Sequence, residues 1–211
     1  MSTFPQLSNI RDIRKKLGLN QSEFWSKIGV TQSGGSRYES GRNMPKPVRE
    51  LLRMGRSLAV GVPVPAPDGY RILPFQPADA EGVVAVNRAA FAHHPEQGRL
   101  SIDDFYALTR QPWFDPAGLL VAHRDGQTTG FHWTKRHDAT LGEVYVLAVQ
   151  PGHGGGGLGR ALLEAGLAYL RDAGCERVEL YVEAAEERVA ALYKAAGFHV
   201  LTADTSYRAG A

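Results

Sequence analysis

Residues 147–163 read LAVQPGHGGGGLGRALL and decide the fold of the larger part of this chain. Apolar residues end an expected strand, a turn with four consecutive glycines follows, and the spacing of Leu158, Ala161 and Leu162 predicts an amphipathic helix. Such a turn points successive backbone N–H groups at one place beside a helix N-terminus. The stretch therefore predicts a site for a diphosphate group, because these donors and the helix dipole favour negative charge.

Two other phosphate-binding turns are excluded by this stretch. It lacks the Gly-Lys-Ser/Thr ending of a Walker loop, and no acidic ribose partner ends a following parallel strand, as a dinucleotide fingerprint requires. A plain flexible turn is the remaining alternative, and the ordered elements expected on both sides argue against it.

The elements around the turn predict an α+β fold with a mixed sheet. Several strands precede the turn, and one strand–helix–strand unit follows it. Expected strands lie at residues 70–75, 118–122, 128–134, 142–149, 177–182 and 198–201, and expected helices at 77–92, 102–109, 158–173 and 186–196.

The composition divides the chain of 211 residues into two modules. Residues 1–57 hold 11 Lys and Arg against 4 Asp and Glu, whereas residues 58–211 hold 13 against 18. The basic part is expected to attract a polyanion, although an accidental surface bias would give the same numbers. Alternating prolines predict a Pro-rich linker over 58–68, between a domain at 1–57 and a domain at 69–211.

Other features of the sequence point to a cytoplasmic protein with no membrane partner. No apolar run approaches the ~18 residues that span a bilayer, and the first residues lack the pattern of a secretory signal. Cys175 is the single cysteine, so no internal disulfide is possible. No metal is expected, because the spacing of four histidines fits no standard ligand set: His93, His94, His132 and His137.

The basic N-terminal module shows the pattern of short helices. Apolar spacing predicts one helix over residues 7–17, a second over 21–28 that Asn20 caps, a third that Thr31 caps, and a fourth over 48–54. The fourth would be built on Val48, Leu51, Leu52 and Met54.

Residues 18–45, GLNQSEFWSKIGVTQSGGSRYESGRNMP, resemble the Cro-type helix-turn-helix family. In that family the third helix enters the major groove, where Gln and Arg hydrogen-bond to base edges. The resemblance implies DNA as a partner and a dimer as a possible form. A helical bundle that docks on a protein remains open, because Gly34 and Gly35 weaken the third helix. The residues that would face DNA are Gln21, Gln32, Ser33, Ser36 and Arg37.

The glycine stretch resembles motif A of the GNAT N-acetyltransferase family, in which the turn binds the pyrophosphate of acetyl-CoA. The resemblance implies a GNAT fold, whose mixed, mostly antiparallel sheet is flanked by helices, with acetyl-CoA as co-substrate and a strand edge that holds the pantetheine arm. Gly154 stands where the family usually has Gln or Arg, and Glu186 where it commonly has Asn, so weakened affinity is expected. The implied binding residues are Leu147, Ala148, Val149, Gly154, Gly155, Gly156, Gly157, Leu158, Gly159, Arg160 and Glu186.

Five blocks resemble the C-terminal, catalytic half of the mycothiol synthase family. They lie at residues 91–98, 112–115, 130–135, 142–146 and 180–182. That family acetylates the cysteinyl amine of a cysteine–glucosamine–inositol conjugate, desacetylmycothiol, and carries two GNAT halves, whereas here a helix-turn-helix replaces the first. The resemblance implies acceptor contacts from Glu96, Lys135, Glu143 and Tyr181.

Two residues are expected to perform the proton transfers. The acceptor amine must lose a proton, which Glu143 can take directly or through water, and the departing thiolate needs a proton, which Tyr193 can give. Tyr193 occupies the general-acid position of the family. A solvated Glu143 and a Tyr193 that only fills the core are the alternatives for these residues.

These features predict an N-acetyltransferase that acts on a primary amine, with the cysteinyl amine of desacetylmycothiol as the named candidate. A DNA-binding transcriptional regulator whose GNAT domain senses acyl-CoA is the alternative. A recombined chain whose halves share no function is a third reading.

Overall fold

The computed structural model describes residues 14–15, 18–27, 36, 49–58, 64–93 and 97–206. Its contacts divide the chain into two units. One consists of Met1–Leu52, Val182–Ala190 and Thr202–Ala211, and the other of Arg53–Tyr181 and Ala191–Leu201. None of the described helices is both long and apolar enough to cross a membrane.

The expected second helix of the N-terminal module is confirmed as α2 (Gln21–Lys27). Asn20 caps it, since its side chain accepts a hydrogen bond from the Glu23 N–H at 2.8 Å. The Glu23 carboxylate in turn accepts one from the Asn20 N–H at 3.0 Å, which completes a capping box. Trp25 is fully buried. Gln21 and Ser36 are described as helical, whereas Gln32, Ser33 and Arg37 lie outside the described residues.

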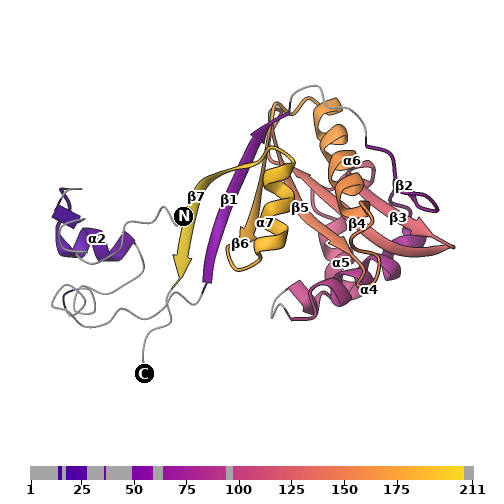
Figure 1. The fold of residues 1–211 in the computed structure, drawn as a ribbon, viewed down its shortest axis with the longest axis horizontal. Helices are drawn as coiled ribbons and strands as arrows, with labels where there is room; N and C mark the ends of the chain where they lie inside the picture. Colours follow the sequence, from indigo (N-terminus) through magenta and orange to yellow (C-terminus); the bar gives the residue numbers. More distant parts are fainter. Residues whose placement is uncertain are drawn as a thin grey trace. The chain divides into compact units, whose positions relative to one another are not determined.

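The strands form one mixed sheet of seven, in the order β2-β3-β4-β5-β6-β1-β7 (Figure 1). Neighbouring strands from β2 to β5 pair antiparallel, whereas β5 and β6 pair parallel. This sheet confirms the expected fold class. The strands are β1 (Arg49–Ser57), β2 (Arg71–Pro74), β3 (Leu119–Arg124), β4 (Gln127–Arg136), β5 (Leu141–Val149), β6 (Arg177–Glu183) and β7 (His199–Ser206).

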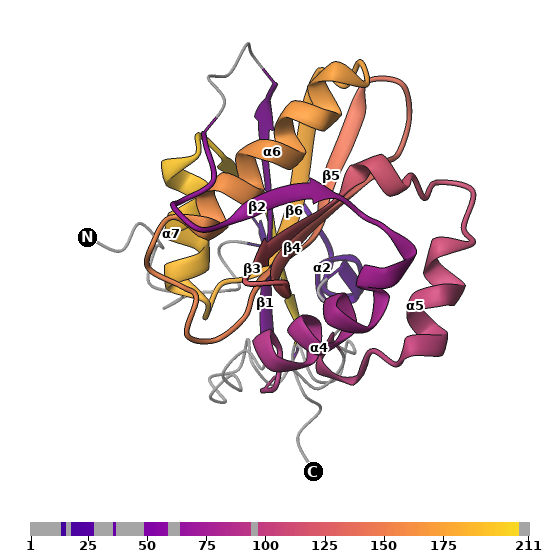
Figure 2. The same ribbon diagram turned by 90° about the vertical axis from the view of Figure 1, so that its right-hand side faces the viewer.

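Different helices cover the two faces of the sheet. Figures 1 and 2 show α6 (Leu158–Asp172) on one face, and α4 (Ala80–Ala90) and α5 (Ile102–Thr109) on the other. Two clusters of buried apolar side chains fill these layers, one under α4 and α5 and one under α6. The remaining elements are the short 3-10 turns Pro77–Asp79, Gln97–Arg99 and Pro116–Gly118 and the helix α7 (Glu187–Ala195).

The sequence prediction was wrong for the fourth N-terminal helix. Residues Arg49–Ser57 form the strand β1, which lies between β6 and β7. A short apolar run suits a helix or a buried strand, and periodicity alone does not separate them. The strand is packed closely at Gly55, where a Cβ would lie 2.7 Å from the Leu201 side chain and 3.3 Å from the Val178 carbonyl oxygen. The position between β6 and β7 therefore favours a small residue at this point.

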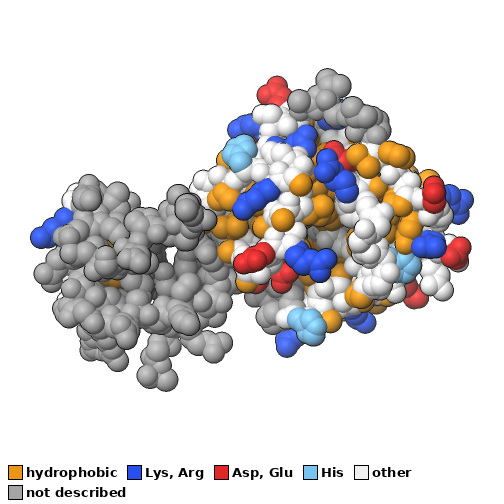
Figure 3. Space-filling model, viewed as in Figure 1, with side chains coloured by type: hydrophobic (Ala, Val, Ile, Leu, Met, Phe, Trp, Pro, Cys, Tyr) orange, Lys and Arg blue, Asp and Glu red, His pale blue; other side chains and the backbone are white. Residues whose placement is uncertain are grey.

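The acidic excess of residues 58–211 does not gather into one patch on the visible face. Figure 3 shows acidic and basic side chains interspersed with apolar ones over the part drawn in colour. This face therefore offers no extended surface of a single charge.

Candidate active site

The glycine-rich turn between β5 and α6 has the backbone conformation that only glycine adopts easily. Gly152, Gly155 and Gly157 have φ angles of 92°, 85° and 89°. Gly157 is the N-cap of α6, so the first N–H groups of the helix have no partner within the helix. A Cβ added at Gly154, Gly155 or Gly156 would meet nothing within 4 Å. The turn is thus an open cradle of backbone donors, and it fits a diphosphate.

Three hydrogen-bonded side chains next to this turn, those of Arg124, Tyr70 and His153, were not predicted from the sequence. The Tyr70 hydroxyl lies 2.9 Å from His153 Nδ1, and Arg124 donates a hydrogen bond to that hydroxyl at 3.1 Å. The hydrogen bond to Tyr70 raises the pKa of Arg124, so the guanidinium of Arg124 stays positively charged. Tyr70 and His153 are 83 positions apart, and nothing in the sequence pairs them.

β5 and β6 separate before the turn is reached. Their pairing covers only Leu141, Gly142 and Glu143 of β5. Leu147, Ala148 and Val149 pair with β4 on one side, and no described strand pairs with their other edge. This open edge runs directly into the glycine-rich turn, where the sequence predicted a pantetheine arm.

A β-bulge marks the place where the strands separate. Trp133 stands opposite Val146, and Thr134 opposite Val144, so Tyr145 is the extra residue of β5. Bulges of this kind re-aim side chains and are common beside active sites. The bulge lies just beyond Glu143, where the open edge of β5 begins.

Glu143 lies in a row of charged residues across neighbouring strands. Lys135 of β4 and Glu179 of β6 are its partners in register. The Glu143 carboxylate is 2.8 Å from His137 Nε2, and its side chain is 12% exposed, which leaves it accessible but mostly shielded. Glu179 accepts a hydrogen bond from Arg53 Nε at 2.9 Å and lies 3.9 Å from His137 Nε2. His137 thus stands between two carboxylates.

The structure brings only some of the predicted acceptor residues together. Lys135 Nζ lies 5.0 Å from the Trp113 ring centre and 5.5 Å from that of Tyr145. Burial, and then the charge of Glu143, raise the pKa of Tyr145. Tyr181 is exposed and lies two residues beyond Glu179, on the same face of β6. Glu96 lies outside the described residues.

Tyr193 and Glu186 come from the last part of the chain. The Tyr193 side chain is buried, with its ring centre 5.6 Å from that of Phe198. Burial raises the pKa of the Tyr193 phenol, so the group keeps its proton at neutral pH. Glu186 is exposed, and its carbonyl accepts the Ala190 N–H at 2.9 Å, at the start of α7. Arg160 donates to Glu164 at 2.9 Å within α6.

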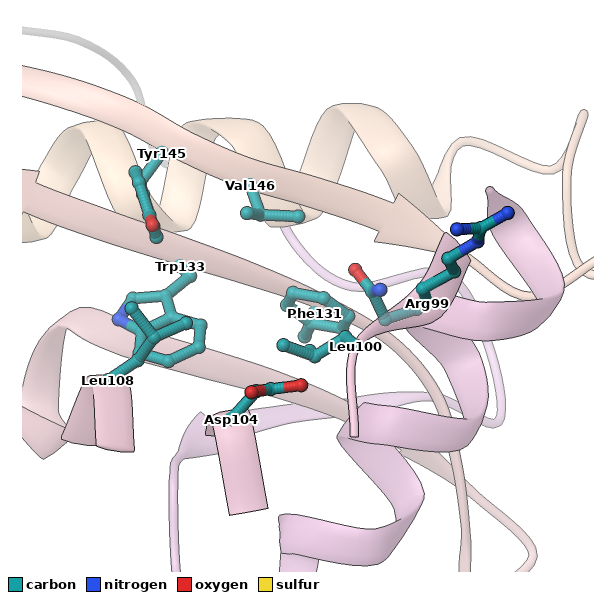
Figure 4. A pocket seen from close by; sticks show the side chains of 9 residues that line it. Arg99, Leu100, Asp104, Leu108, Phe131, Trp133, Tyr145 and Val146 are labelled. Atoms are coloured by element: carbon teal, nitrogen blue, oxygen red, sulfur yellow. The ribbon is translucent and has the colours of Figure 1, made fainter. Parts of the chain in front are cut away.

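A pocket of ≈ 320 Å³ opens on the face that α4 and α5 cover (Figure 4). Figure 4 shows apolar side chains along its length, the Asp104 carboxylate facing them, and Arg99 turned away at one end. Hydrogen bonds from Ser101 lower the pKa of Asp104, so that carboxylate is ionised. The lining residues are Asn87, Arg99, Leu100, Asp104, Leu108, Phe131, Trp133, Tyr145 and Val146.

Tyr145 and Trp133 connect this pocket with the row of charges. Tyr145 lines the pocket, stands two residues after Glu143, and contacts Lys135 through its ring. The Trp133 indole N–H is buried and, within the described part of the chain, has no hydrogen-bond partner. A donor of this kind is free for an acceptor atom that enters the pocket. Neither the pocket nor this donor was predicted from the sequence.

Comparison with known proteins identifies the two parts of the chain separately. A family model described as "RsaL-like HTH domain" matches residues 11–55, and a model described as "Acetyltransferase (GNAT) family" matches residues 87–198. The predicted helix-turn-helix and GNAT resemblances are both confirmed. The first model extends into β1, which belongs to the seven-stranded sheet.

Curated relatives share the C-terminal part. A protein named mycothiol acetyltransferase from Propionibacterium freudenreichii subsp. shermanii is 48% identical over 166 residues, which cover 76% of this chain and 53% of the relative. One of the same name from Thermobispora bispora is 45% identical over 181 residues, covering 82% and 61%. The chain thus spans a little over half the length of these relatives.

Solved structures of acetyltransferases share the fold of this chain. A GCN5-related N-acetyltransferase from Sphaerobacter thermophilus matches with a TM-score of 0.65 and 25% identity, over 82% of this chain and 55% of that one. A GNAT family acetyltransferase from Brucella melitensis, solved in complex with acetyl-CoA, matches with a TM-score of 0.51 and 24% identity, over 66% and 96%. With a family model that covers more than half of its residues, this chain belongs to the acetyltransferase (GNAT) family.

Proposed function

We propose that the chain is an N-acetyltransferase that transfers the acetyl group of acetyl-CoA to a primary amine. One observation carries this proposal: β5 and β6 stop pairing at Glu143, and the freed edge of β5 leads straight to the glycine-rich turn. The candidate base thus stands at one end of the opening and the diphosphate cradle at the other. A pantetheine arm is the natural link between them, because it joins a thioester to a diphosphate.

The donor would be held by backbone groups. The N–H groups of the glycine-rich turn and of the first turn of α6 would bind the pyrophosphate. A backbone N–H of Leu147, Ala148 or Val149 would meet the oxyanion that develops on the thioester carbonyl. Arg160 supplies little here, since it is already paired with Glu164.

Proton transfers would be shared by Glu143 and Tyr193. Glu143 is the one carboxylate of the row that the open edge of β5 adjoins, and it would take a proton from the attacking amine. The raised pKa of Tyr193 keeps its hydroxyl protonated, so it can donate to the departing thiolate.

The acceptor is proposed to be the cysteinyl amine of desacetylmycothiol, because the relatives of this chain are named mycothiol acetyltransferases. Lys135 and Tyr181 lie on the same face of the sheet as Glu143 and would contact the hydroxyl groups of the acceptor. The pocket behind Tyr145 would hold the part of the acceptor that lies away from the amine. Its ionised Asp104 and free indole N–H suit a ligand with hydroxyl groups rather than a purely apolar one.

The test is amine-dependent release of thiol from acetyl-CoA with desacetylmycothiol. Glu143→Gln and Tyr193→Phe should each lower kcat by roughly 100-fold or more. Glu187→Gln and Tyr106→Phe, exposed positions outside the site, are the matched controls and should keep wild-type rates. A folded wild-type protein that releases no thiol with this or any other primary amine would disprove the proposal.

For the N-terminal module we propose DNA binding, which the helix-turn-helix match and the basic composition support. Gln21, at the start of α2, would approach the phosphate backbone of the DNA. The residues that would approach the base edges are Gln32, Ser33, Ser36 and Arg37. Fluorescence anisotropy with a labelled duplex should detect binding that weakens steeply with salt. Binding that Gln32→Ala and Arg37→Ala leave unchanged would place the contact elsewhere.

The division into residues 1–57, 58–68 and 69–211 stays a prediction. β1 pairs within the sheet of the larger unit, although its residues precede the proline-rich segment. The composition places residues 49–57 in the first domain, whereas the strand pairing places them in the sheet that β2 to β7 also form.

A further inference from the structure

The candidate base Glu143 is part of a continuous chain of charged groups that ends in the segment before the proline-rich linker. Glu143 and Glu179 are register partners on parallel strands, so their side chains project from the same face. Two carboxylates in this position repel each other. Both are mostly buried, at 12% and 7% side-chain exposure, so water screens them poorly. The pair needs compensating positive or donor groups.

Two groups supply that compensation from different directions. Arg53 of β1 pairs with Glu179 through both Nε and a terminal nitrogen. His137, which follows β4, places Nε2 2.8 Å from Glu143 and 3.9 Å from Glu179. The other nearby cation, Lys135, is directed to the rings of Trp113 and Tyr145.

His137 also differs from the two carboxylates in its access to water. Its side chain is 34% exposed, about three times the exposure of Glu143. A proton that reaches Glu143 from an amine on the shielded side would therefore have a hydrogen-bonded route to solvent through the imidazole.

We propose that His137 is the proton exit for the base Glu143, and that Arg53 acts through Glu179 as a positioning residue that holds this exit in place. This inference rests on the proposed acetyltransferase function. An alkylammonium acceptor gives a proton to the Glu143 carboxylate and becomes the neutral amine. The resulting carboxyl group gives that proton to Nε2 of a neutral His137 whose own proton is on Nδ1, which restores the carboxylate. The imidazolium releases a proton to water, and exchange with water returns the imidazole to the tautomer that is protonated on Nδ1. No oxidant or further reactant is needed.

Arg53 brings β1 into this arrangement. It lies in β1, 126 positions before Glu179, in the stretch that the helix-turn-helix model partly covers. The segment before the linker thus contributes directly to the environment of the catalytic base.

Kinetics test the proton exit. His137→Ala should lower kcat by about tenfold, change the KM for acetyl-CoA by less than about twofold, and recover rate as imidazole is added to the assay. Rescue by imidazole distinguishes a missing proton carrier from a structural defect. A His137→Ala protein with the wild-type kcat, or one that imidazole does not rescue, would overturn this role.

A spectroscopic measurement on the protein without acetyl-CoA tests the positioning role. The imidazole ¹⁵N signal of His137, assigned by its loss in His137→Ala, should shift in Glu143→Gln and in Arg53→Met. Arg53→Lys, which keeps the charge, should largely restore the wild-type signal and kcat. Arg56→Met is the matched control, because Arg56 contacts the Ala196 carbonyl and the Phe198 ring and no member of the row.

If Arg53→Met does not fold, the double variant Arg53→Met/Glu179→Gln removes both charges of the pair at once. It should also shift the His137 signal. An unchanged signal in either folded variant would refute the role of Arg53. If the wild type turns over no amine, the proposed function fails, while the ¹⁵N result still decides whether Arg53 and Glu143 set the environment of His137.

Discussion

Glu143 and Glu179 stand side by side on the parallel strands β5 and β6, and they are the last residue pair before the two strands separate. The carboxylate proposed as the base therefore lies where the sheet opens. Its neighbour is neutralised by Arg53 from β1. The opening of the sheet and the placement of charge are thus two consequences of one strand arrangement.

The left-handed glycines of the turn should be more sensitive to substitution than the glycine between them. Gly155→Ala and Gly157→Ala force a Cβ into φ angles of 85° and 89°, at a cost of roughly 1–2 kcal/mol each. Acetyl-CoA affinity, measured by calorimetry, should fall by about tenfold or more. Gly156→Ala, where φ is not positive and the space is open, is the control and should bind nearly as the wild type does. Equal losses at all three positions would contradict this account.

A basic side chain at Gly154 should strengthen donor binding. A Cβ at Gly154 meets nothing within 4 Å, and its φ is not positive, so an arginine can be accommodated. Its guanidinium would add a charge-assisted contact to a diphosphate. Gly154→Arg should therefore lower the Kd for acetyl-CoA by about tenfold, or ~1.4 kcal/mol. Gly154→Gln should give a smaller gain, and weaker binding by both variants would argue that the diphosphate lies elsewhere.

The buried His132 should make the fold less stable in mild acid. Burial lowers its pKa to about 4, while Nδ1 lies 2.9 Å from the Leu162 carbonyl oxygen. The unfolded chain binds a proton here below about pH 6.5, and the folded chain does not until about pH 4. Stability is therefore lost as the pH falls between these values, on the order of 3 kcal/mol in total.

Urea unfolding of the wild type and of His132→Asn, measured between pH 7 and pH 4.5, checks this expectation. Asparagine can still donate to the Leu162 carbonyl but does not titrate. The gap in stability between the two proteins should narrow as the pH falls, even though the cavity in the variant lowers its stability overall. A gap that does not change with pH would mean that His132 has the same pKa in the folded and unfolded states.

Removal of β1 should destabilise the sheet. β1 lies between β6 and β7, and Met54 of this strand is fully buried. A protein without residues 1–58 leaves the ladders of β6 and β7 unpaired on that side. Its melting temperature should drop by several degrees or more relative to a protein without residues 1–48, which keeps the strand. Equal melting temperatures would show that β6 and β7 pair without β1.

Local signals in the sequence were sufficient for most of the larger unit. The alternation of apolar residues and the glycines of 147–163 predicted β5, the turn and α6, because strand and helix periods and positive φ angles are properties of short segments. The helix at Ile102–Thr109 was predicted with its bounds, and the structure shows a capping box of Ser101 and Asp104 at its start. The candidate base Glu143 was predicted from its place near the start of the strand that leads to the glycine-rich turn.

Tertiary structure alone decided what distant residues do to one another. Residues 49–57 carry an apolar pattern that suits a helix as well as a strand, and only the space between β6 and β7 makes them a strand. The pairing of Arg53 with Glu179, and of Tyr70 with His153, joins positions that no periodicity relates. The sequence determined most of the other elements, because local backbone preferences depend on neighbouring residues. The charged residues that surround Glu143 depend on the order of the strands, because β5, β6 and β1 are neighbours in the sheet only in the folded chain.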